Sequence, residues 1–224
     1  MNVARRRAFT LVELMVVVAL IAGLAMAIIG GAGGGRRTVA LQAAQATLAN
    51  AVTAARTKAI ASGRNVRLLV HDSAESPLAH ARFRRMVVVA EDGAGGWRAA
   101  DVFVLPDGVY VLPHRTRARS GMFVVEAEWR TTDGEQTLGS SALSHAEMTF
   151  SHASDEVERW EWLAFTGRGT VDGAGALVVA AGRWRGTASG ATDSPIEFLE
   201  AGHVRGVMLS NYGVPRLLNE RAAF

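Results

Sequence analysis

The amino-acid sequence predicts an α+β protein in which a long N-terminal helix packs on a small, mostly antiparallel β-sheet domain. Three observations predict this class. Residues 9–29 form an apolar run, residues 38–62 form an alanine-rich stretch with one apolar face, and short β-rich segments separated by turn residues fill the remainder. The length of 224 residues suits one domain with an anchor better than two domains.

The apolar run contains only two clearly polar residues, Thr10 and Glu13. As a helix it would be roughly 30 Å long, which is about the thickness of the hydrocarbon layer of a bilayer. Arg5, Arg6 and Arg7 precede it, and arginines favour the cytoplasmic side. The sequence therefore predicts a leader at residues 1–8 in the cytoplasm, a single inner-membrane span at 9–29, and a domain in the periplasm.

Glu13 is unexpected in a simple membrane anchor. An acidic side chain inside a membrane helix costs on the order of 2–3 kcal/mol at the centre of the bilayer and less toward an end. We therefore expect Glu13 to lie near the interface or to have a partner of opposite charge.

The segment Ala8-Phe9-Thr10-Leu11-Val12-Glu13-Leu14 resembles the cleavage and methylation motif of type IV prepilins and type II secretion pseudopilins. The resemblance implies that prepilin peptidase cleaves between Ala8 and Phe9 and methylates the new amino group of Phe9. It also implies that Glu13 pairs with the amino terminus of a neighbouring subunit during assembly. Ala8 departs from the glycine that usually precedes the cut.

Two plainer interpretations remain for the N-terminus. The first is an ordinary secretory signal peptide, for which Ala25-Met26-Ala27 offers a small-x-small cleavage site. The second is a signal anchor without any role in assembly. The apolar run is longer than the 7–15 residues typical of a signal peptide, and Glu13 interrupts it.

Residues 30–37 include five glycines, which should weaken or break the helix and form a hinge. A phosphate-binding loop is disfavoured here because Gly31-x-Gly33 has no preceding strand. Residues 38–62 are then expected to form a spine helix that buries Leu41, Leu48, Val52, Ala55 and Ala59, with Gly63 as its C-cap.

The remainder of residues 38–224 reads as strands and turns of one domain. The expected strands are Val66–Val70, Met86–Ala90, Val102–Leu105, Val109–Leu112, Met122–Trp129, Trp162–Phe165, Ala176–Ala181, Ile196–Leu199 and Val204–Ser210. The stretches Ser73–Arg82 and Thr131–Glu161 are expected to be insertions or long loops that carry partner-specific surface.

Several fragments of the domain resemble the GspH/FimT group of minor pseudopilins and minor pilins. They are Ala59-x-x-x-Gly63-Arg64-x-Val66, Trp97 before Leu105-Pro106-x-Gly108-Val109, Phe165-Thr166-Gly167 and Gly202-His203-Val204. The resemblance covers nearly the whole chain. It implies a non-enzymatic minor pseudopilin of a type II secretion system, whose partners are other pseudopilins, prepilin peptidase and the inner membrane.

Residues that could carry chemistry are few. There is no cysteine, and the six histidines (His71, His80, His114, His145, His152 and His203) match no metal-binding motif. The acidic run Asp155, Glu156, Glu158 and Glu161 fits no calcium loop, and it alternates with Trp160 and Trp162 as in an amphipathic strand with a solvated edge. We expect no cofactor, no metal and no catalytic residue.

Arginines could bind nucleic acid instead. Arg82, Arg84 and Arg85 form one cluster, Arg115, Arg117 and Arg119 form another, and Arg183-Trp184-Arg185 places an aromatic ring between two cations. However, the net charge of +3 disappears with the leader, because removing Arg5 to Arg7 leaves 21 basic and 21 acidic side chains. The alternative function is therefore a minor pilin of a type IV pilus or DNA-uptake filament, with Arg183, Trp184 and Arg185 as candidate DNA-binding residues.

Overall fold

The computed structural model describes residues 11–73, 79–118, 121–144, 146, 148–150, 158–186 and 196–224, with the backbone alone over residues 23–34. The leader 1–8, Phe9 and Thr10 lie outside the described residues. The chain divides into two compact units: unit 1 ends at Val39, and unit 2 spans Ala40–Phe224.

Helix α1 (Leu11–Ser62) contributes to both units. Its backbone is helical through residues 30–37, so the five glycines do not end the helix, contrary to the sequence-based expectation of a break. A glycine costs about 1 kcal/mol relative to alanine at a helix position, but it keeps both backbone hydrogen-bonding groups, so the helical ladder can continue through it. A hinge at 30–37 stays a prediction. Within the residues whose side chains are described, no helix is both long and apolar enough to cross a membrane.

In unit 2, one face of α1 packs into the main core. The five predicted core positions of the spine helix, from Leu41 to Ala59, are all buried, so this prediction is confirmed. Gln45 lies on the same face, and its side-chain amide donates to the carbonyls of Gly206 (2.8 Å) and Leu218 (2.9 Å). The helix ends at Ser62, and Gly63 has a φ of +64°, as expected of a C-cap.

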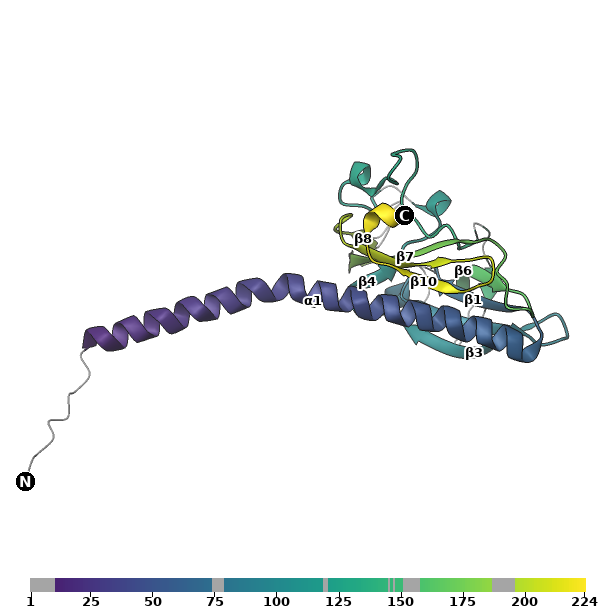
Figure 1. The fold of residues 1–224 in the computed structure, drawn as a ribbon, viewed down its shortest axis with the longest axis horizontal. Helices are drawn as coiled ribbons and strands as arrows, with labels where there is room; N and C mark the ends of the chain where they lie inside the picture. The colour runs from purple at the N-terminus through teal and green to yellow at the C-terminus, as the bar shows by residue number, and fades with distance from the viewer. Residues whose placement is uncertain are drawn as a thin grey trace, which may run out of the picture. The chain divides into compact units, whose positions relative to one another are not determined.

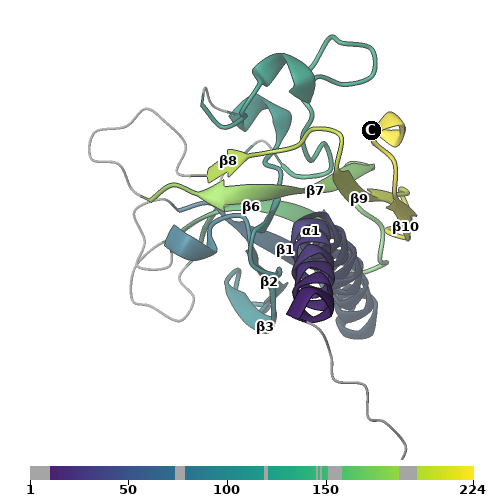
Figure 2. The same ribbon diagram turned by 90° about the vertical axis from the view of Figure 1, so that its left-hand side faces the viewer.

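Two antiparallel sheets pack against this part of the helix, whose opposite face is exposed (Figures 1 and 2). The first has the strand order β3-β2-β1-β6-β5, and the second has the order β10-β9-β7-β4, with β8 paired to β7. The strands are β1 (Val66–His71), β2 (Arg85–Glu91), β3 (Trp97–Val104), β4 (Val109–Val111), β5 (Met148–Phe150), β6 (Glu158–Phe165), β7 (Gly175–Trp184), β8 (Ile196–Phe198), β9 (Val204–Leu209) and β10 (Pro215–Leu218). The predicted fold class, a long N-terminal helix with antiparallel sheets, is confirmed.

One predicted strand is wrong. Residues 122–129 form an isolated bridge at Phe123 and then the 3₁₀ helix η3 (Glu126–Trp129). The rings of Phe123 and Trp129 stack with centroids 4.9 Å apart, which draws both into the core and turns the chain between them. This packing outweighs the intrinsic β propensity of the valines in the segment.

The expected loop at 131–161 is also only partly right. It contains β5 and the first half of β6, and it therefore adds an edge strand to the first sheet. The short 3₁₀ helix η1 (Ala79–Ala81) lies in the other expected loop, and η2 (Arg115–Arg117) and η4 (Arg221–Ala223) complete the elements of unit 2.

The first sheet is apolar on both sides. Val66, Leu68 and Val70 of β1 belong to the main core with α1. Because side chains alternate along a strand, Leu69 points to the opposite side. There it is buried with Val87, Val89 and Trp160 in a second cluster, which the partly buried Trp97, Ala99, Met148, Phe150 and Trp162 cover.

Candidate functional site

The described part of unit 1 is a helix with a single acidic residue in its first turn, Glu13. A carboxylate is favoured at a helix N-terminus because the backbone N–H groups there carry partial positive charge. Ala8 and Phe9, the residues expected to flank the cleavage site, lie outside the described residues.

Apolar side chains surround Glu13 on the helix surface. Nine large apolar residues between Leu11 and Ile21 have exposed fractions from 47% to 77%, and they occupy consecutive positions rather than one stripe. An amphipathic surface helix has one apolar face, whereas a helix that is apolar all round requires surroundings that are apolar all round. A contiguous exposed apolar surface of this kind marks an interaction site with protein or lipid.

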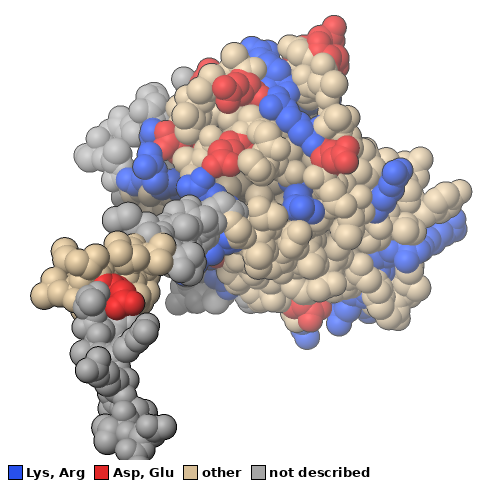
Figure 3. Space-filling view, turned by 60° about the vertical axis from the view of Figure 1, so that its left-hand side comes forward, with Lys and Arg blue, Asp and Glu red and all other residues tan. Residues whose placement is uncertain are grey.

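The candidate DNA-binding residues lie at the end of β7, and each contacts another residue of unit 2. Arg183 forms an ion pair with Glu197 at 2.6 Å, Arg185 pairs with the other oxygen of the same carboxylate, and Trp184 packs against the main core. Both arginines lower the pKa of Glu197, chiefly through the Arg183 hydrogen bond. Basic and acidic side chains are also intermixed over the face of unit 2 drawn in Figure 3. DNA binding through this segment stays a prediction, and the carboxylate of Glu197 offsets one of its two positive charges.

A buried ionic network joins four segments of unit 2. Asp72 accepts two hydrogen bonds from Arg82, at 2.9 and 2.7 Å, and one from Arg117 at 2.7 Å. Arg117 also pairs with Glu161 at 3.0 Å, and the backbone N–H of His114 donates to Glu161 at 2.9 Å. Burying charged groups is favourable only when they are paired and hydrogen-bonded, so this arrangement fixes the end of β1 against η2 and β6.

Glu161 is the member of this network with the most strongly shifted pKa. Burial, reinforced by the negative charge of Asp72, raises its pKa from 4.5 to about 8 although Arg117 and the His114 N–H oppose the shift. A carboxyl group whose folded pKa exceeds its unfolded pKa holds its proton more tightly in the folded state. The stability that protonated Glu161 contributes to the fold is therefore complete below about pH 4.5 and is lost as the pH rises through about 8.

Glu158 is buried as well, so the interpretation of this acidic run as a solvated strand edge is wrong for Glu158 and Glu161. Pairing of β6 with both β1 and β5 removes it from the edge. Glu158 and Glu161 are three positions apart on the strand, so they point to opposite faces of the sheet. Glu158 lies 3.6 Å from His71, whose pKa burial lowers although Glu158 opposes the shift. Asp155 and Glu156 lie outside the described residues.

No group of three or more potential metal ligands occurs among the described residues. His145 and His152 are outside that part of the chain. The buried acids Asp72, Glu158, Glu161 and Glu197 each lie in one of the ion pairs above.

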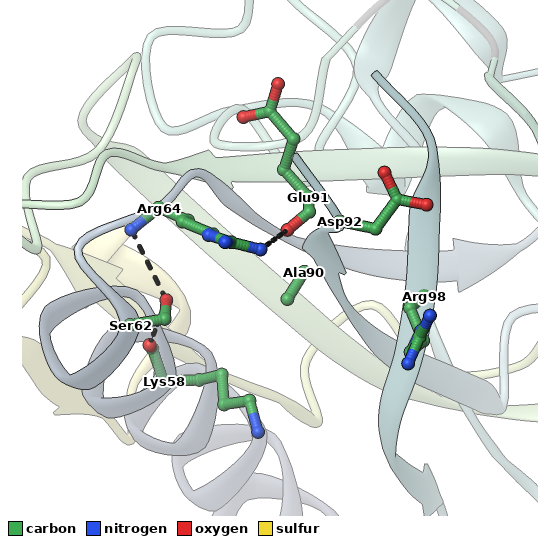
Figure 4. Close-up of a pocket in the computed structure, with 7 residues that line it drawn as sticks. All are labelled: Lys58, Ser62, Arg64, Ala90, Glu91, Asp92 and Arg98. Atoms are coloured by element: carbon green, nitrogen blue, oxygen red, sulfur yellow. Dashed lines mark hydrogen bonds between the residues drawn. The ribbon is translucent and has the colours of Figure 1, made fainter. Parts of the chain in front are cut away.

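An open pocket of about 380 Å³ lies beside the end of α1. Figure 4 shows its lining residues, which are Lys58, Ser62, Arg64, Ala90, Glu91, Asp92 and Arg98. Arg64 donates to the backbone carbonyl of Glu91 at 3.4 Å, and Asp92 accepts from the backbone N–H groups of Ala94 and Gly96. Because charges of both signs line it and several hold the local turns, the pocket indicates no particular ligand class.

Two polar features were not foreseen from the sequence: the Asp72 network, and the placement of Arg67 between Trp97 and Trp162. Both depend on which strands are neighbours. The alternation of Trp160 and Trp162 with acidic residues was the available signal, and it correctly indicated a strand without indicating its position in the sheet.

Comparison with protein families gives a match at the N-terminus. Residues 3–30 match the family model described as the prokaryotic N-terminal methylation motif. No curated protein matches the chain.

Two solved structures of the minor pseudopilin EpsH from the type 2 secretion system of Vibrio cholerae are similar to this chain. They have 12% and 16% sequence identity, each with a TM-score of 0.40 over 80% of this chain and 96% or 98% of theirs. Similarity at this level establishes no function. The matched residues do show that the chain begins with the N-terminal methylation motif of type IV prepilin-like proteins.

Proposed function

We propose that the chain is a non-enzymatic minor pseudopilin of a type II secretion system. Prepilin peptidase cleaves it between Ala8 and Phe9 and methylates Phe9, and the mature chain then enters a short filament with other pseudopilins. The observation that carries the proposal is the methylation motif at residues 3–30, within which the helix surface of residues 11–22 is apolar in every direction except at Glu13.

The exposed surface of residues 11–22 fits two successive environments. In the inner membrane, as a single-pass anchor with the leader in the cytoplasm and unit 2 in the periplasm, lipid covers it. In a filament, the equivalent helices of neighbouring subunits cover it. Both environments are apolar, so transfer between them changes the hydrophobic contribution of the side chains little.

An ion pair made by Glu13 fixes the axial register between neighbouring subunits during assembly. A carboxylate and an ammonium group each lose hydration in an apolar environment, and pairing them offsets that loss. In the mature chain the amino group of Phe9 of the adjoining subunit supplies the ammonium. Only one axial offset between subunits brings the two groups together.

Intact-mass and N-terminal analysis of the protein from membranes of its own host tests the processing step. The expected mature chain begins at methylated Phe9. A chain that begins after Ala27 would instead identify an ordinary exported protein, and the role assigned to Glu13 would be wrong.

A Glu13→Ala variant tests the assembly step. We expect it to be cleaved and methylated normally but to be absent from crosslinked filament fractions, because the amino group of the neighbour loses its partner. Val12→Ala is the matched control, since it removes an adjacent exposed apolar side chain without changing charge. Normal incorporation of the Glu13→Ala protein would refute the pairing.

Disruption of the gene in the host distinguishes a type II secretion system from a type IV pilus or DNA-uptake filament. Loss of secreted enzymes from the medium supports the type II secretion system. Intact secretion with loss of surface pili or of DNA uptake would instead support the minor pilin.

A further inference from the structure

The charged side chains in the described part of unit 1 lie at its two ends. Glu13 is in the first turn of α1, and Arg36 and Arg37 lie close to the end of the unit at Val39. Residues 14–35, which lie between them, include no charged residue. Glu13 and Arg36 are 23 positions apart. This separation is roughly 35 Å along a helix, and the hydrocarbon layer of a bilayer is about 30 Å thick. The two charges therefore fit just outside the two surfaces of that layer.

The backbone of α1 stays helical through the glycine-rich residues 30–35 (Figure 1). In water such a segment favours breaking the helix, because glycine is the least favourable residue in a helix apart from proline. Hydrocarbon contains no water to compete for backbone groups, so the N–H and C=O groups bond within the helix. Glycine is accordingly more frequent in membrane-spanning helices than in soluble ones. A helix that continues through these residues is what lipid surroundings produce.

Arg36 and Arg37 are both exposed on the helix surface. Adjacent residues are about 100° apart around a helix axis, so the two side chains extend in different directions. The sequence has no acidic residue between Glu13 and Asp72, so α1 itself brings no carboxylate near either arginine. A guanidinium group matches the geometry of phosphate oxygens and is weakly hydrated, which makes arginine a favoured phosphate ligand. Where a helix leaves the hydrocarbon layer, the nearest phosphates are those of phospholipid headgroups.

We infer that residues 14–35 are the segment in the hydrocarbon layer, and that Arg36 and Arg37 each bind a phospholipid phosphate of the periplasmic leaflet, preferably of an anionic lipid. The expected span of 9–29 thereby moves outward, and Glu13 lies at the cytoplasmic surface. The inference rests on the proposed membrane anchor. Once the leader is removed, these two arginines are the only cationic side chains in residues 9–39, so they hold the mature helix at a fixed depth until it enters the filament.

Thiol accessibility tests the position of the span, because the chain has no native cysteine. Full-length Ala32→Cys and Val39→Cys proteins are produced in the host, and spheroplasts are treated with a membrane-impermeant maleimide. We expect Val39→Cys, at a position that is 64% exposed, to react at least about tenfold faster than Ala32→Cys, which hydrocarbon shields. Equal rates in the membrane fraction would show that residues 30–35 lie above the lipid, and the inference would be wrong.

Native mass spectrometry tests the phosphate ligand. The full chain is analysed in micelles that contain equal amounts of phosphatidylglycerol and phosphatidylcholine, and the ratio of the two bound lipids is measured. The Arg36→Gln/Arg37→Gln variant should lower the preference for phosphatidylglycerol by about fivefold for each arginine removed. Lys58→Gln/Arg168→Gln is the matched control, because it removes the same charge from two exposed positions of unit 2 and should leave the ratio unchanged. The leader arginines are the same in every variant, so they do not affect the difference.

Two further results would overturn the assignment of the phosphate ligand. The first is a lipid ratio that changes equally in the Arg36→Gln/Arg37→Gln variant and in the control. The second is displacement of the bound phosphatidylglycerol by excess inorganic phosphate, which would identify a site for a soluble anion. Membrane fractionation and the mass of the mature chain are measured separately. Failure of the lipid contact is therefore distinguishable from failure of the proposed function.

Discussion

Gly167 should be the glycine of unit 2 at which an added methyl group is most damaging to the end of the spine helix. It follows β6 and lies against the C-terminal turn of α1. A Cβ at this position would be 2.3 Å from the carbonyl oxygen of Gly63, 2.5 Å from its carbonyl carbon and 3.0 Å from the backbone nitrogen of Arg64. All three contacts are with backbone, so no side-chain rotation relieves them.

The expected cost of Gly167→Ala follows from two opposing effects. Forcing an extra methyl group into a packed site costs about 1–3 kcal/mol, and rigid backbone neighbours place this site at the upper end. Replacing glycine reduces the entropy of the unfolded chain, which returns about 0.4–1 kcal/mol. The net loss is about 2 kcal/mol, which lowers the Tm of a domain of this size by roughly 4–8 °C.

Thermal unfolding followed by circular dichroism, with the full chain in detergent micelles, measures this loss. Gly202→Ala is the matched control, because no atom lies within 4 Å of its added Cβ and its φ is not positive. If Gly167→Ala melts at the same temperature as Gly202→Ala, the close approach between the loop after β6 and the end of α1 does not exist as described.

Three further substitutions test other parts of unit 2. Glu161→Gln cannot release a proton, so its stability relative to the wild type should rise by a few kcal/mol between pH 5 and pH 8; a pH-independent difference would contradict the raised pKa. Gln45→Met leaves two backbone carbonyls without their donor and should cost roughly 2–4 kcal/mol in urea unfolding, whereas a loss below about 1 kcal/mol would mean that water replaces it. Glu197→Ala frees Arg183 and Arg185, so it should bind duplex DNA more tightly at low salt than the wild type does; equal binding would show that these arginines do not contact DNA.

Local patterns were sufficient to predict the spine helix and most strands. The spacing of Leu41, Leu48 and Val52 identified the buried face of the helix, because a helix period places those positions together whatever they pack against. Gly63 identified the helix end, since few other residues adopt a positive φ without strain. Short β-rich runs bounded by turn residues located β1, β2 and β7 for a similarly local reason.

The sequence-based predictions that were wrong or incomplete concern properties that depend on residues far away in the sequence. Glu158 and Glu161 look like solvated acids in the sequence, and only the pairing of β6 between β1 and β5 buries them. The short strands β5 and β10 were missed because their order comes from the strands beside them rather than from their own residues. The N-terminal methylation motif could be identified from the sequence, because it consists of consecutive residues and does not depend on distant neighbours.

The buried network around Asp72 has a consequence for the kinetics of unfolding. Its contacts join residues 10, 45 and 47 positions apart in sequence, so the network closes only after η1, η2 and β6 have reached their places. Interactions that form late in folding are largely absent from the transition state, and they slow unfolding without accelerating folding. The network therefore lengthens the lifetime of the folded domain more than it shortens the time needed to reach it.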